Sequence, residues 1–381
     1  MIATVGPTPP TQVDAAMALS FKPSINWLFL FIPVTLLLER AGSVPPPAVF
    51  FSAALSIVPI ASLIVRATEQ LSTHTGEAIG GLLNATFGNA PELIIAAVAL
   101  KAGLFDMVLA SLVGAILANL LLALGVAFLL GGLRYHDQDY SAGATRIYTS
   151  MMLMAVISLV IPSSFSRFFT ATDELNQVEH SLNLVLAISL LAAYVLYLVF
   201  MIKTHPALFA RKGGTSHGHA EGKPWSIPQA VGALLAASVL AAWMSEVLVE
   251  AAHPTGKALG MSDTFIGIVF LAIVGGAAES GSAIAMALKN KVDLTVGIAL
   301  GSSIQIALFV APLLVLLSYV MAPRPLTLAF GRPELGSLFL AVLIGALVAG
   351  DGRGNWYKGV QLITVYATIA MLFYFIPEEV R

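Results

Sequence analysis

The sequence predicts an all-α polytopic membrane protein, and three observations support this prediction. Of the 381 residues, 58% are hydrophobic and only 10% are charged, whereas soluble domains carry about 25% charged residues. The mean hydropathy is +0.89. The 32 glycines and 20 prolines recur inside apolar runs, which is typical of transmembrane helices. Together these observations exclude a soluble globular fold.

About 20 mostly apolar residues are needed to span a bilayer as a helix, and eleven segments are expected to do so. They cover residues 26–39, 48–65, 78–100, 107–130, 147–163, 182–202, 227–249, 264–288, 294–320, 335–350 and 360–377. The first is short. The third, fourth, eighth and ninth are long and interrupted by Gly, Asn, Ser or Glu, so we expect tilted or broken helices there.

The sequence repeats itself at a constant offset of 187 residues. The stretch GNAPELIIAAVALKAGLFD aligns without gaps on GGAAESGSAIAMALKNKVD, which pairs Gly88 with Gly275 and Glu92 with Glu279. The same offset pairs Asp106 with Asp293, and two apolar stretches rarely match two acids at one offset by chance. The copies begin on the third and the eighth predicted helices, which are five helices apart, and an odd offset means that the copies cross the membrane in opposite directions. Such inverted repeats place the substrate site of a transporter near the membrane midplane.

The charges of the loops predict the orientation, because Lys and Arg collect on the cytoplasmic side. Eleven spans leave twelve Lys and Arg residues on one face and seven on the other. We therefore expect a protein of the cell (inner) membrane, surrounded by lipid, with a cytoplasmic N-terminus and an external C-terminus. The longest polar connection, RKGGTSHGHAEGKP, lies on the cytoplasmic side and divides the two halves. His217 and His219 in it form either a regulatory metal site or part of a solvated linker.

Two glutamates inside apolar helices are the main candidates for function. Inserting a helix with an acid at its centre into the membrane costs about 2.5–3.5 kcal/mol on insertion scales. The presence of Glu92 and Glu279 at such positions therefore indicates a functional role. Asn89 lies one helical turn before Glu92, while Gly88 and Gly275 interrupt the two helices. Carboxylate, amide and backbone carbonyl oxygens are the ligands of hard cations such as Ca²⁺ and Mg²⁺. These residues predict a cation site.

Further polar residues form a second set, for which a cation or proton path and a purely structural role remain alternatives. Glu69 and Glu246 occupy similar places near the ends of the second and seventh helices. The other members of this set are Asn84, Ser280, Ser282, Ser303 and Gln305. Ser111, Asn119 and Ser302 could equally hold helices together, and Asp106 and Asp293 are expected in turns between helices.

The composition and motifs also exclude several function classes. A formal charge of −2 offers no basic surface for nucleic acid, and the absence of cysteine excludes disulfides and thiolate sites. No HExxH, Gly-x-Ser-x-Gly or P-loop motif occurs, so neither a hydrolase nor an ATP-driven pump is indicated. We expect a protein that is not an enzyme and has no cofactor.

Two long motifs resemble those of the calcium/proton exchangers of the Ca²⁺/cation antiporter superfamily. They are GGLLNATFGNAPELI at residues 80–94 and KNKVDLTVGIALGSSIQIALFVAP at residues 289–312, and KTHPALF before the central loop is similar as well. The resemblance implies binding roles for Asn89, Glu92 and Glu279, with backbone carbonyls near Gly88 and Gly275. It also implies an accessory transmembrane helix (26–40), a first five-helix repeat (47–202) and a second inverted five-helix repeat (226–378). From the residues themselves we expect a flexible tail (1–25) before them and a cytoplasmic linker (203–225) between the repeats.

The second motif departs from the family pattern at two positions. The pattern Gly-Asn-Ala-Ala-Glu-His is replaced by Gly275, Gly276, Ala277, Ala278, Glu279 and Ser280. A carboxamide and an imidazole are therefore missing from this half. Ion selectivity and proton coupling are the properties that this difference affects.

The resulting prediction is a secondary antiporter that exports Ca²⁺, as transported substrate, from the cytoplasm in exchange for protons. Cation and protons compete for the same carboxylates, which couples their fluxes by alternating access. The alternatives are a Na⁺-driven exchanger, a broad exchanger of Mn²⁺ or Mg²⁺, and, from another class, a cation channel or membrane sensor. The duplicated interrupted helices favour alternating access over a channel. A homo-oligomer is compatible with the sequence.

Overall fold

The computed structural model describes residues 24–42, 44–168, 173–209 and 224–376. Most of the expected N-terminal tail and of the linker, including His217 and His219, lies outside these residues. In chain order the elements are η1 Ile25–Leu30, α1 Phe31–Ala41, α2 Pro46–Phe87, α3 Ala90–Lys101, α4 Phe105–Leu117, η2 Ala118–Ala123, α5 Leu124–Tyr135, β1 Asp137–Asp139, α6 Ala142–Phe168, α7 Asp173–Val199, η3 Phe200–Thr204, α8 Pro206–Phe209, α9 Ile227–Leu259, α10 Asp263–Phe265, η4 Ile266–Leu271, α11 Ala272–Gly275, α12 Ala277–Leu288, α13 Val292–Gln305, η5 Ile306–Val310, α14 Ala311–Met321, α15 Arg332–Ala349, β2 Arg353–Asn355 and α16 Trp356–Phe375.

The all-α class predicted from the sequence is confirmed, but the count of eleven spans is not. In the described residues, eight helices are long and apolar enough to cross a membrane, or nine if the bent pair Asp263–Gly275 and Ala277–Leu288 is one span. The first expected span is a 3₁₀ turn followed by the eleven-residue α1, which is short for a crossing. The second and third expected spans share the 42-residue α2.

Helix α2 bends sharply in its last third, between Ser72 and Gly80. The Ser72 hydroxyl donates a hydrogen bond to the carbonyl oxygen of Gly80 at 3.1 Å. In a straight helix, residues eight apart lie about 12 Å apart along the axis, so the chain must turn back between them. The part after the bend leads through Gly88 and Asn89 into α3. The third expected segment is thus present as a broken helix rather than as one long span.

Helix boundaries recur at the same offset of 187 residues as the sequence. Helices α3, α4 and α5 begin at Ala90, Phe105 and Leu124, while α12, α13 and α14 begin at Ala277, Val292 and Ala311. In both copies a π-helical segment, η2 or η5, joins the last two helices. Sequence and local geometry therefore repeat together.

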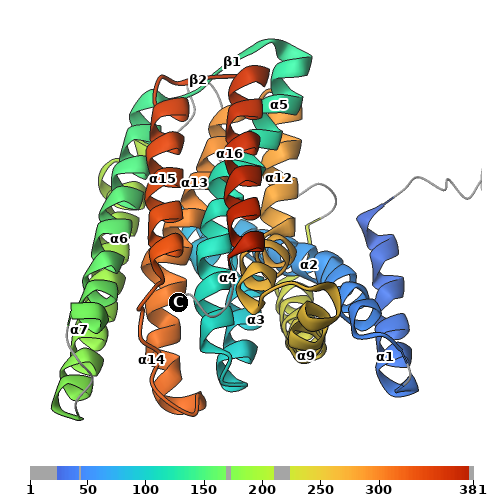
Figure 1. Cartoon of the computed structure of the whole chain (residues 1–381). Helices are drawn as coiled ribbons and strands as arrows, with labels where there is room; N and C mark the ends of the chain where they lie inside the picture. The colour runs from blue at the N-terminus through green and yellow to red at the C-terminus, as the bar shows by residue number, and fades with distance from the viewer. Residues whose placement is uncertain (1–23, 43, 169–172, 210–223, 377–381) are drawn as a thin grey trace, which may run out of the picture.

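The two copies run in opposite directions (Figure 1). The start of α4 lies at the end of α14, where the Arg324 guanidinium stacks 4.4 Å from the centroid of the Phe105 ring. At the other end of the molecule, the Tyr135 hydroxyl at the end of α5 donates to the carbonyl of Leu288, just before α13. Helix α4 thus begins at the end of the molecule where α14 finishes.

A small two-stranded sheet joins the first half of the chain to the second at one end of the molecule. Strands β1 and β2 pair antiparallel, and Figure 1 shows them at the top of the helices. The buried Gln138 side chain of β1 donates to the carbonyl of Ala287 at 2.9 Å and to Asn290 Oδ1 at 2.9 Å. These bonds connect the first copy to the end of α12. Arg134, Lys289 and Arg353 are three of the twelve basic residues that the loop charges predict on the cytoplasmic face, and their loops meet at this end of the molecule.

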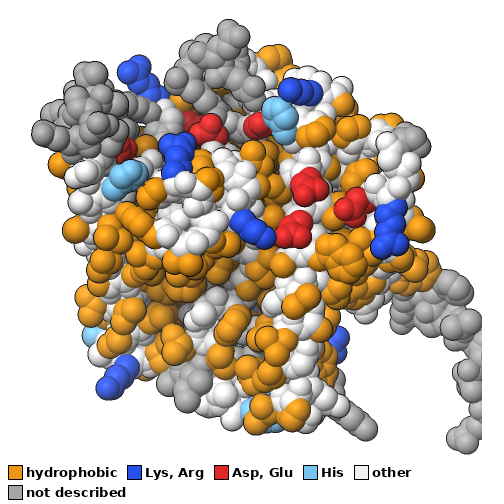
Figure 2. Space-filling model, turned by 90° about the horizontal axis from the view of Figure 1, so that it is seen from below, with side chains coloured by type: hydrophobic (Ala, Val, Ile, Leu, Met, Phe, Trp, Pro, Cys, Tyr) orange, Lys and Arg blue, Asp and Glu red, His pale blue; other side chains and the backbone are white. Residues whose placement is uncertain are grey.

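Apolar side chains form two cores and also cover much of the outside. One core is centred on α2 and α9, and the other joins α3–α7 with α12–α16. Many large apolar residues remain exposed, such as Leu196, Val239 and Leu347 at 68%, 68% and 71%. Figure 2 shows such side chains around the end seen from below, with charged side chains gathered between them. This distribution fits helices surrounded by lipid.

Candidate functional site

The site is built on two breaks in helices, one in each copy. Asn89 (φ −94°, ψ 24°) precedes α3, and its partner at the 187-residue offset, Gly276 (φ −78°, ψ 6°), precedes α12. Helices α11 and α12 meet at an angle of 59°. Glu92 and Glu279 each occupy the third position of the helix that follows the break. A carboxylate in the first turn interacts favourably with the positive end of the helix dipole.

Each glutamate lies against the break of the opposite copy. A Cβ atom placed at Gly88 would lie 3.3 Å from Glu279 Oε1, and one placed at Gly275 would lie 3.0 Å from Glu92 Cγ. Position 276 also faces Glu92, at a slightly longer distance of 3.6 Å from such a Cβ to Glu92 Oε1. The glycines thus permit the two broken helices to bring both carboxyl groups into one region.

The group around Glu279 is rich in hydrogen bonds. The Ser302 hydroxyl donates to Glu279 Oε2, and the Asn89 amide donates to Gln305 Oε1. Ser302 and Gln305 both come from α13, while Asn89 belongs to the other copy. The group therefore offers one carboxylate, two amide oxygens and a hydroxyl. All are hard oxygen donors.

The group around Glu92 is more deeply buried and less complete. Glu92 is 8% exposed and Asn119, from η2, is 2% exposed. Among the described residues, neither carboxylate oxygen of Glu92 nor the Asn119 amide nitrogen has a hydrogen-bond partner. A Cβ at Gly276 would lie 3.7 Å from Asn119 Oδ1. An asparagine at position 276, equivalent to Asn89, would face these unpartnered groups. Because glycine stands there instead, this half of the site lacks one side-chain amide.

A cavity of about 280 Å³ leads to Glu279 along one face of α13, and we call it the α13 cavity. Its lining on α13 runs from Asp293 in the first turn to Gln305 in the last, which is about 18 Å along the helix axis. Gly88, Glu279 and Ser302 lie at the inner end. Tyr148, Tyr197 and Phe209 form an aromatic wall. The cavity gives Glu279 a route to one end of the molecule.

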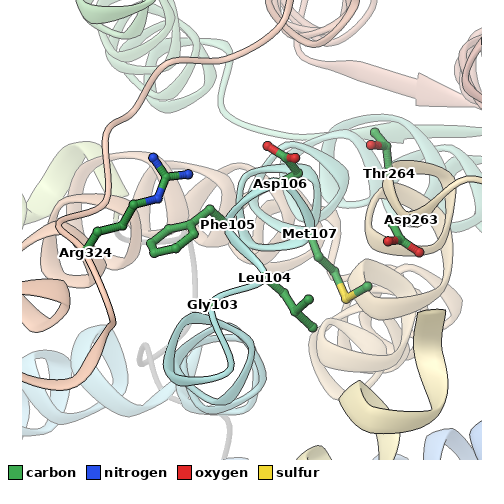
Figure 3. Close-up of a pocket in the computed structure, with 8 residues that line it drawn as sticks. All are labelled: Gly103, Leu104, Phe105, Asp106, Met107, Asp263, Thr264 and Arg324. Carbon is green, nitrogen blue, oxygen red and sulfur yellow. The ribbon is translucent and has the colours of Figure 1, made fainter. Parts of the chain in front are cut away.

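A second cavity, of about 340 Å³, lies at the opposite end of the molecule and is lined by Asp106, Asp263, Thr264 and Arg324, among others. Figure 3 shows these side chains coming from α4, from α10 and from the segment after α14, with Arg324 beside Phe105. Asp106 is the repeat partner of Asp293, and each is the second residue of its helix, whereas the sequence placed them in the turns just before these helices. Neither glutamate of the site is among the residues that line this second cavity.

The surroundings of α13 and of its repeat partner α4 differ in how closely other helices approach them. Gly301 of α13 faces the cavity, and a Cβ placed there would have no atom within 4 Å. Its repeat partner Gly114 in α4 is packed against η4, where a Cβ would lie 2.6 Å from the carbonyl carbon of Ile268. The α13 side is therefore open and the α4 side is closed. At the closed end, an ion pair joins Lys101 to Glu246 at 3.7 Å, and His253 Nδ1 lies at hydrogen-bond distance, 2.7 Å, from Asp263 Oδ2.

The remaining predicted residues divide into two groups. Glu69, Asn84 and Ser282 line the α13 cavity together with Glu279. Ser303 is fully buried and donates to the carbonyl of Ala299, and Glu246 lies with Lys101 at the closed end. Ser280 follows Glu279 in α12 but is not among the described residues that line the cavity.

Several residues of the region were not singled out from the sequence, or were left as helix-packing residues. Ser302 and Asn119 had both interpretations open, and their neighbours at Glu279 and Gly276 favour a place in the site. Tyr148 and Tyr197 gave no signal, because aromatic residues in apolar helices are most often core, and Phe209 was noted only as the last residue of the motif KTHPALF. The described residues hold no group of three or more His, Cys, Asp or Glu side chains suited to a metal. A cation here would depend on neutral oxygens beside the two carboxylates.

Comparisons with known proteins agree with one another. The family model described as "Sodium/calcium exchanger protein" matches residues 46–203 and 229–375. The Ca(2+)/H(+) antiporter ChaA of Bacillus subtilis is 41% identical over 350 residues, which is 91% of this chain and 98% of that protein. The Ca(2+)/H(+) antiporter of Aphanothece halophytica is 37% identical over 92% and 96%.

Solved structures show the same likeness. Native YfkE has a TM-score of 0.79 at 37% identity and covers 93% of this chain and 100% of its own. The H+/Ca2+ exchanger CAX has a TM-score of 0.67 at 13% identity, with 92% and 91% covered. The second likeness concerns the fold alone.

Proposed function

Because this chain belongs to the sodium/calcium exchanger protein family, we propose that it is a secondary antiporter that exports Ca²⁺ in exchange for protons. The observation that carries the proposal is the pair of repeat-related glutamates, Glu92 and Glu279, each set against the broken helix of the opposite copy. The names of the relatives, which are Ca(2+)/H(+) antiporters, favour protons over Na⁺ as the coupling ion.

In this proposal, Ca²⁺ enters through the α13 cavity and reaches Glu279. Ser302, Gln305 and Asn89 supply further oxygens, and Glu92 with Asn119 completes the site from the other copy. The backbone carbonyls near Gly88 and Gly275 are additional ligands. A buried carboxylate needs a cation or a proton to offset its charge. Because Ca²⁺ and protons occupy the same groups in turn, each change of access carries one load or the other.

The difference between the open α13 side and the closed α4 side supports alternating access. The two copies are inverted, so exchanging their local conformations would close the first route and open the second. The decisive measurement is ⁴⁵Ca²⁺ uptake into everted membrane vesicles with an imposed proton gradient. Uptake that requires a Na⁺ gradient instead would identify the Na⁺-driven alternative, and uptake without counterflow would identify a channel.

The proposed orientation places the end with the α12–α13 turn in the cytoplasm. The chain has no cysteine, so single cysteines report without background. In intact cells, an impermeant thiol reagent is expected to label Lys257→Cys, at the closed end, and to spare Lys289→Cys; both positions are exposed. Permeabilised cells should label both, which controls for reactivity. The reverse pattern in intact cells would invert the orientation and the direction of export.

The missing amide at Gly276 predicts weak discrimination among divalent cations. A side chain at this position points toward Glu92 and Asn119, and its Cβ has 3.3 Å to the carbonyl oxygen of Ala272, so asparagine fits with a small adjustment. Gly276→Asn is expected to raise the apparent affinity for Ca²⁺ relative to Mn²⁺ and Mg²⁺ by about tenfold, or about 1.4 kcal/mol. Competition of each cation against ⁴⁵Ca²⁺ measures this ratio.

The control for that substitution is Gly276→Ala, which adds the Cβ without the amide. Thermal unfolding of both variants establishes that they are folded. An unchanged cation ranking in folded Gly276→Asn would mean that position 276 serves only helix packing.

A further inference from the structure

The outer end of the α13 cavity is bordered by α8, which follows directly on η3. The first three residues of this four-residue helix are exposed, while Phe209 is half-buried. Phe209 lines the α13 cavity together with Asp293 and Tyr148. Asp293 lies in the first turn of α13, one helix length away from the inner end at Gln305. Phe209 is therefore the side chain by which α8 reaches the mouth of this route.

A continuous series of ring contacts holds Phe209 in this position. Its ring centroid lies 5.5 Å from that of Tyr148 and 6.2 Å from that of Phe200, the latter edge to face at 87°. The His205 ring stacks on Phe200 at 4.3 Å. Such pairs stabilise by edge-to-face and offset geometry. The series extends from an exposed imidazole to a tyrosine on the cavity wall.

The backbone before α8 has the properties of a hinge. Residues Phe200–Thr204 are π-helical, a distortion that is frequent at functional sites. The His205 amide donates to the carbonyl of Phe200 at 2.8 Å, and His205 then leaves the helix at φ −134° and ψ 47°. Pro206 has no amide hydrogen to continue the helix. A few residues at the end of an element can absorb such a rotation.

We propose that α8 is a hinged lid over the mouth of the α13 cavity and that Phe209 is its gating side chain. With its ring on Tyr148, Phe209 narrows the route to Glu279; rotation of α8 about Thr204 and His205 withdraws the ring and admits the ion. The inference deepens the proposed function and rests on it, because a lid has a role only if this route carries the ion. The test below does not depend on transport.

The experiment measures access to the cavity in purified protein. A cysteine at Gly301 serves as the reporter, because this position faces the cavity and a Cβ there has no atom within 4 Å. The probe is a cationic methanethiosulfonate reagent, and the rate of labelling is measured without Ca²⁺. In the Gly301→Cys background, Phe209→Ala is expected to raise the rate by about tenfold, the equivalent of about 1.4 kcal/mol. Phe209→Leu, which keeps apolar bulk but loses ring stacking, should give a smaller rise.

The matched control is Leu208→Ala, since Leu208 belongs to the same helix and is 42% exposed on its outer side. Its rate should equal that of the parent. Equal rates in the parent, Phe209→Ala and Phe209→Leu would overturn the lid, as would an equal rise in Leu208→Ala. The melting temperature of each variant shows whether it is folded, and only folded variants are compared. If Phe209→Ala does not fold, the labelling rate of Phe209→Leu decides the test. Failure of Ca²⁺ exchange with a positive labelling result would reject the proposed function and leave the lid in place.

Discussion

Replacing Glu279 by glutamine is expected to abolish Ca²⁺ exchange while leaving the protein folded. Glutamine has nearly the same shape and can still accept the hydrogen bond from Ser302, so the packing of α12 on α13 should survive. It lacks the negative charge, however. At an effective dielectric constant of about 20, two unit charges about 4 Å apart interact by about 4 kcal/mol. We therefore expect apparent Ca²⁺ affinity to fall by more than about 100-fold, or about 2.8 kcal/mol.

Glu92→Gln should have the same effect, because Glu92 lies against Gly275 and Gly276 of the opposite copy. The matched control is Glu246→Gln, which removes an acid from α9 that is 53% exposed and pairs with Lys101. An exposed pair of this kind contributes little, so exchange should stay close to that of the parent. ⁴⁵Ca²⁺ counterflow in vesicles and thermal unfolding measure both properties. Normal counterflow in either glutamine variant would remove that glutamate from the site.

The sequence predicted the helical class and the position of the broken helices well, because both depend on local signals. Long apolar runs define the helices, and Gly88 and Gly275, the predicted interruptions, each lie one residue before Asn89 and Gly276, where the chain departs from helical geometry. The predicted number of eleven spans was not confirmed. The bend that brings Ser72 to Gly80 lies inside a stretch with mixed polarity, where hydropathy does not show that one helix turns back on itself.

Within the site, the residues with a local sequence signal were predicted, and those that depend on the tertiary fold were not. The two glutamates were found because an acid is rare in an apolar helix. Their neighbours Ser302 and Asn119 were not distinguished from packing residues, since Ser and Asn commonly link helices in membranes. Glu69 and Glu246 looked alike in sequence, yet one lines the cavity with Glu279 and the other lies at the closed end. Only the fold of α2 and α9 separates them.

The paired interfaces of the two copies define what closure of the α13 cavity requires. In the closed interface, α4 and η4 approach so closely that Gly114 and Gly267 have no room for a side chain; a Cβ at Gly267 would lie 2.7 Å from Ala110 Cβ. If the α13 side closes in the same way, Gly301 must come equally close to the end of α2. Glycine would then be required at position 301 in the closed state although it is not required in the open one.

Gly301→Ala is therefore expected to bind Ca²⁺ normally but to exchange it slowly. A single methyl group fits in the open cavity, where nothing lies within 4 Å, so Ca²⁺ should still raise the melting temperature as in the parent. Overpacking a tight interface costs about 1–3 kcal/mol, which corresponds to a loss of exchange rate of about fivefold to about 150-fold. Gly301→Leu should abolish exchange.

Gly336→Ala is the matched control for Gly301→Ala, because Gly336 is exposed on α15 in the same copy and also has no atom within 4 Å of a Cβ. It should bind and exchange Ca²⁺ like the parent. ⁴⁵Ca²⁺ counterflow gives the exchange rate, and the Ca²⁺-induced rise in melting temperature gives binding. If Gly301→Ala exchanges at the parental rate, the α13 side does not close as the α4 side does, and the two halves do not alternate by exchanging equivalent conformations.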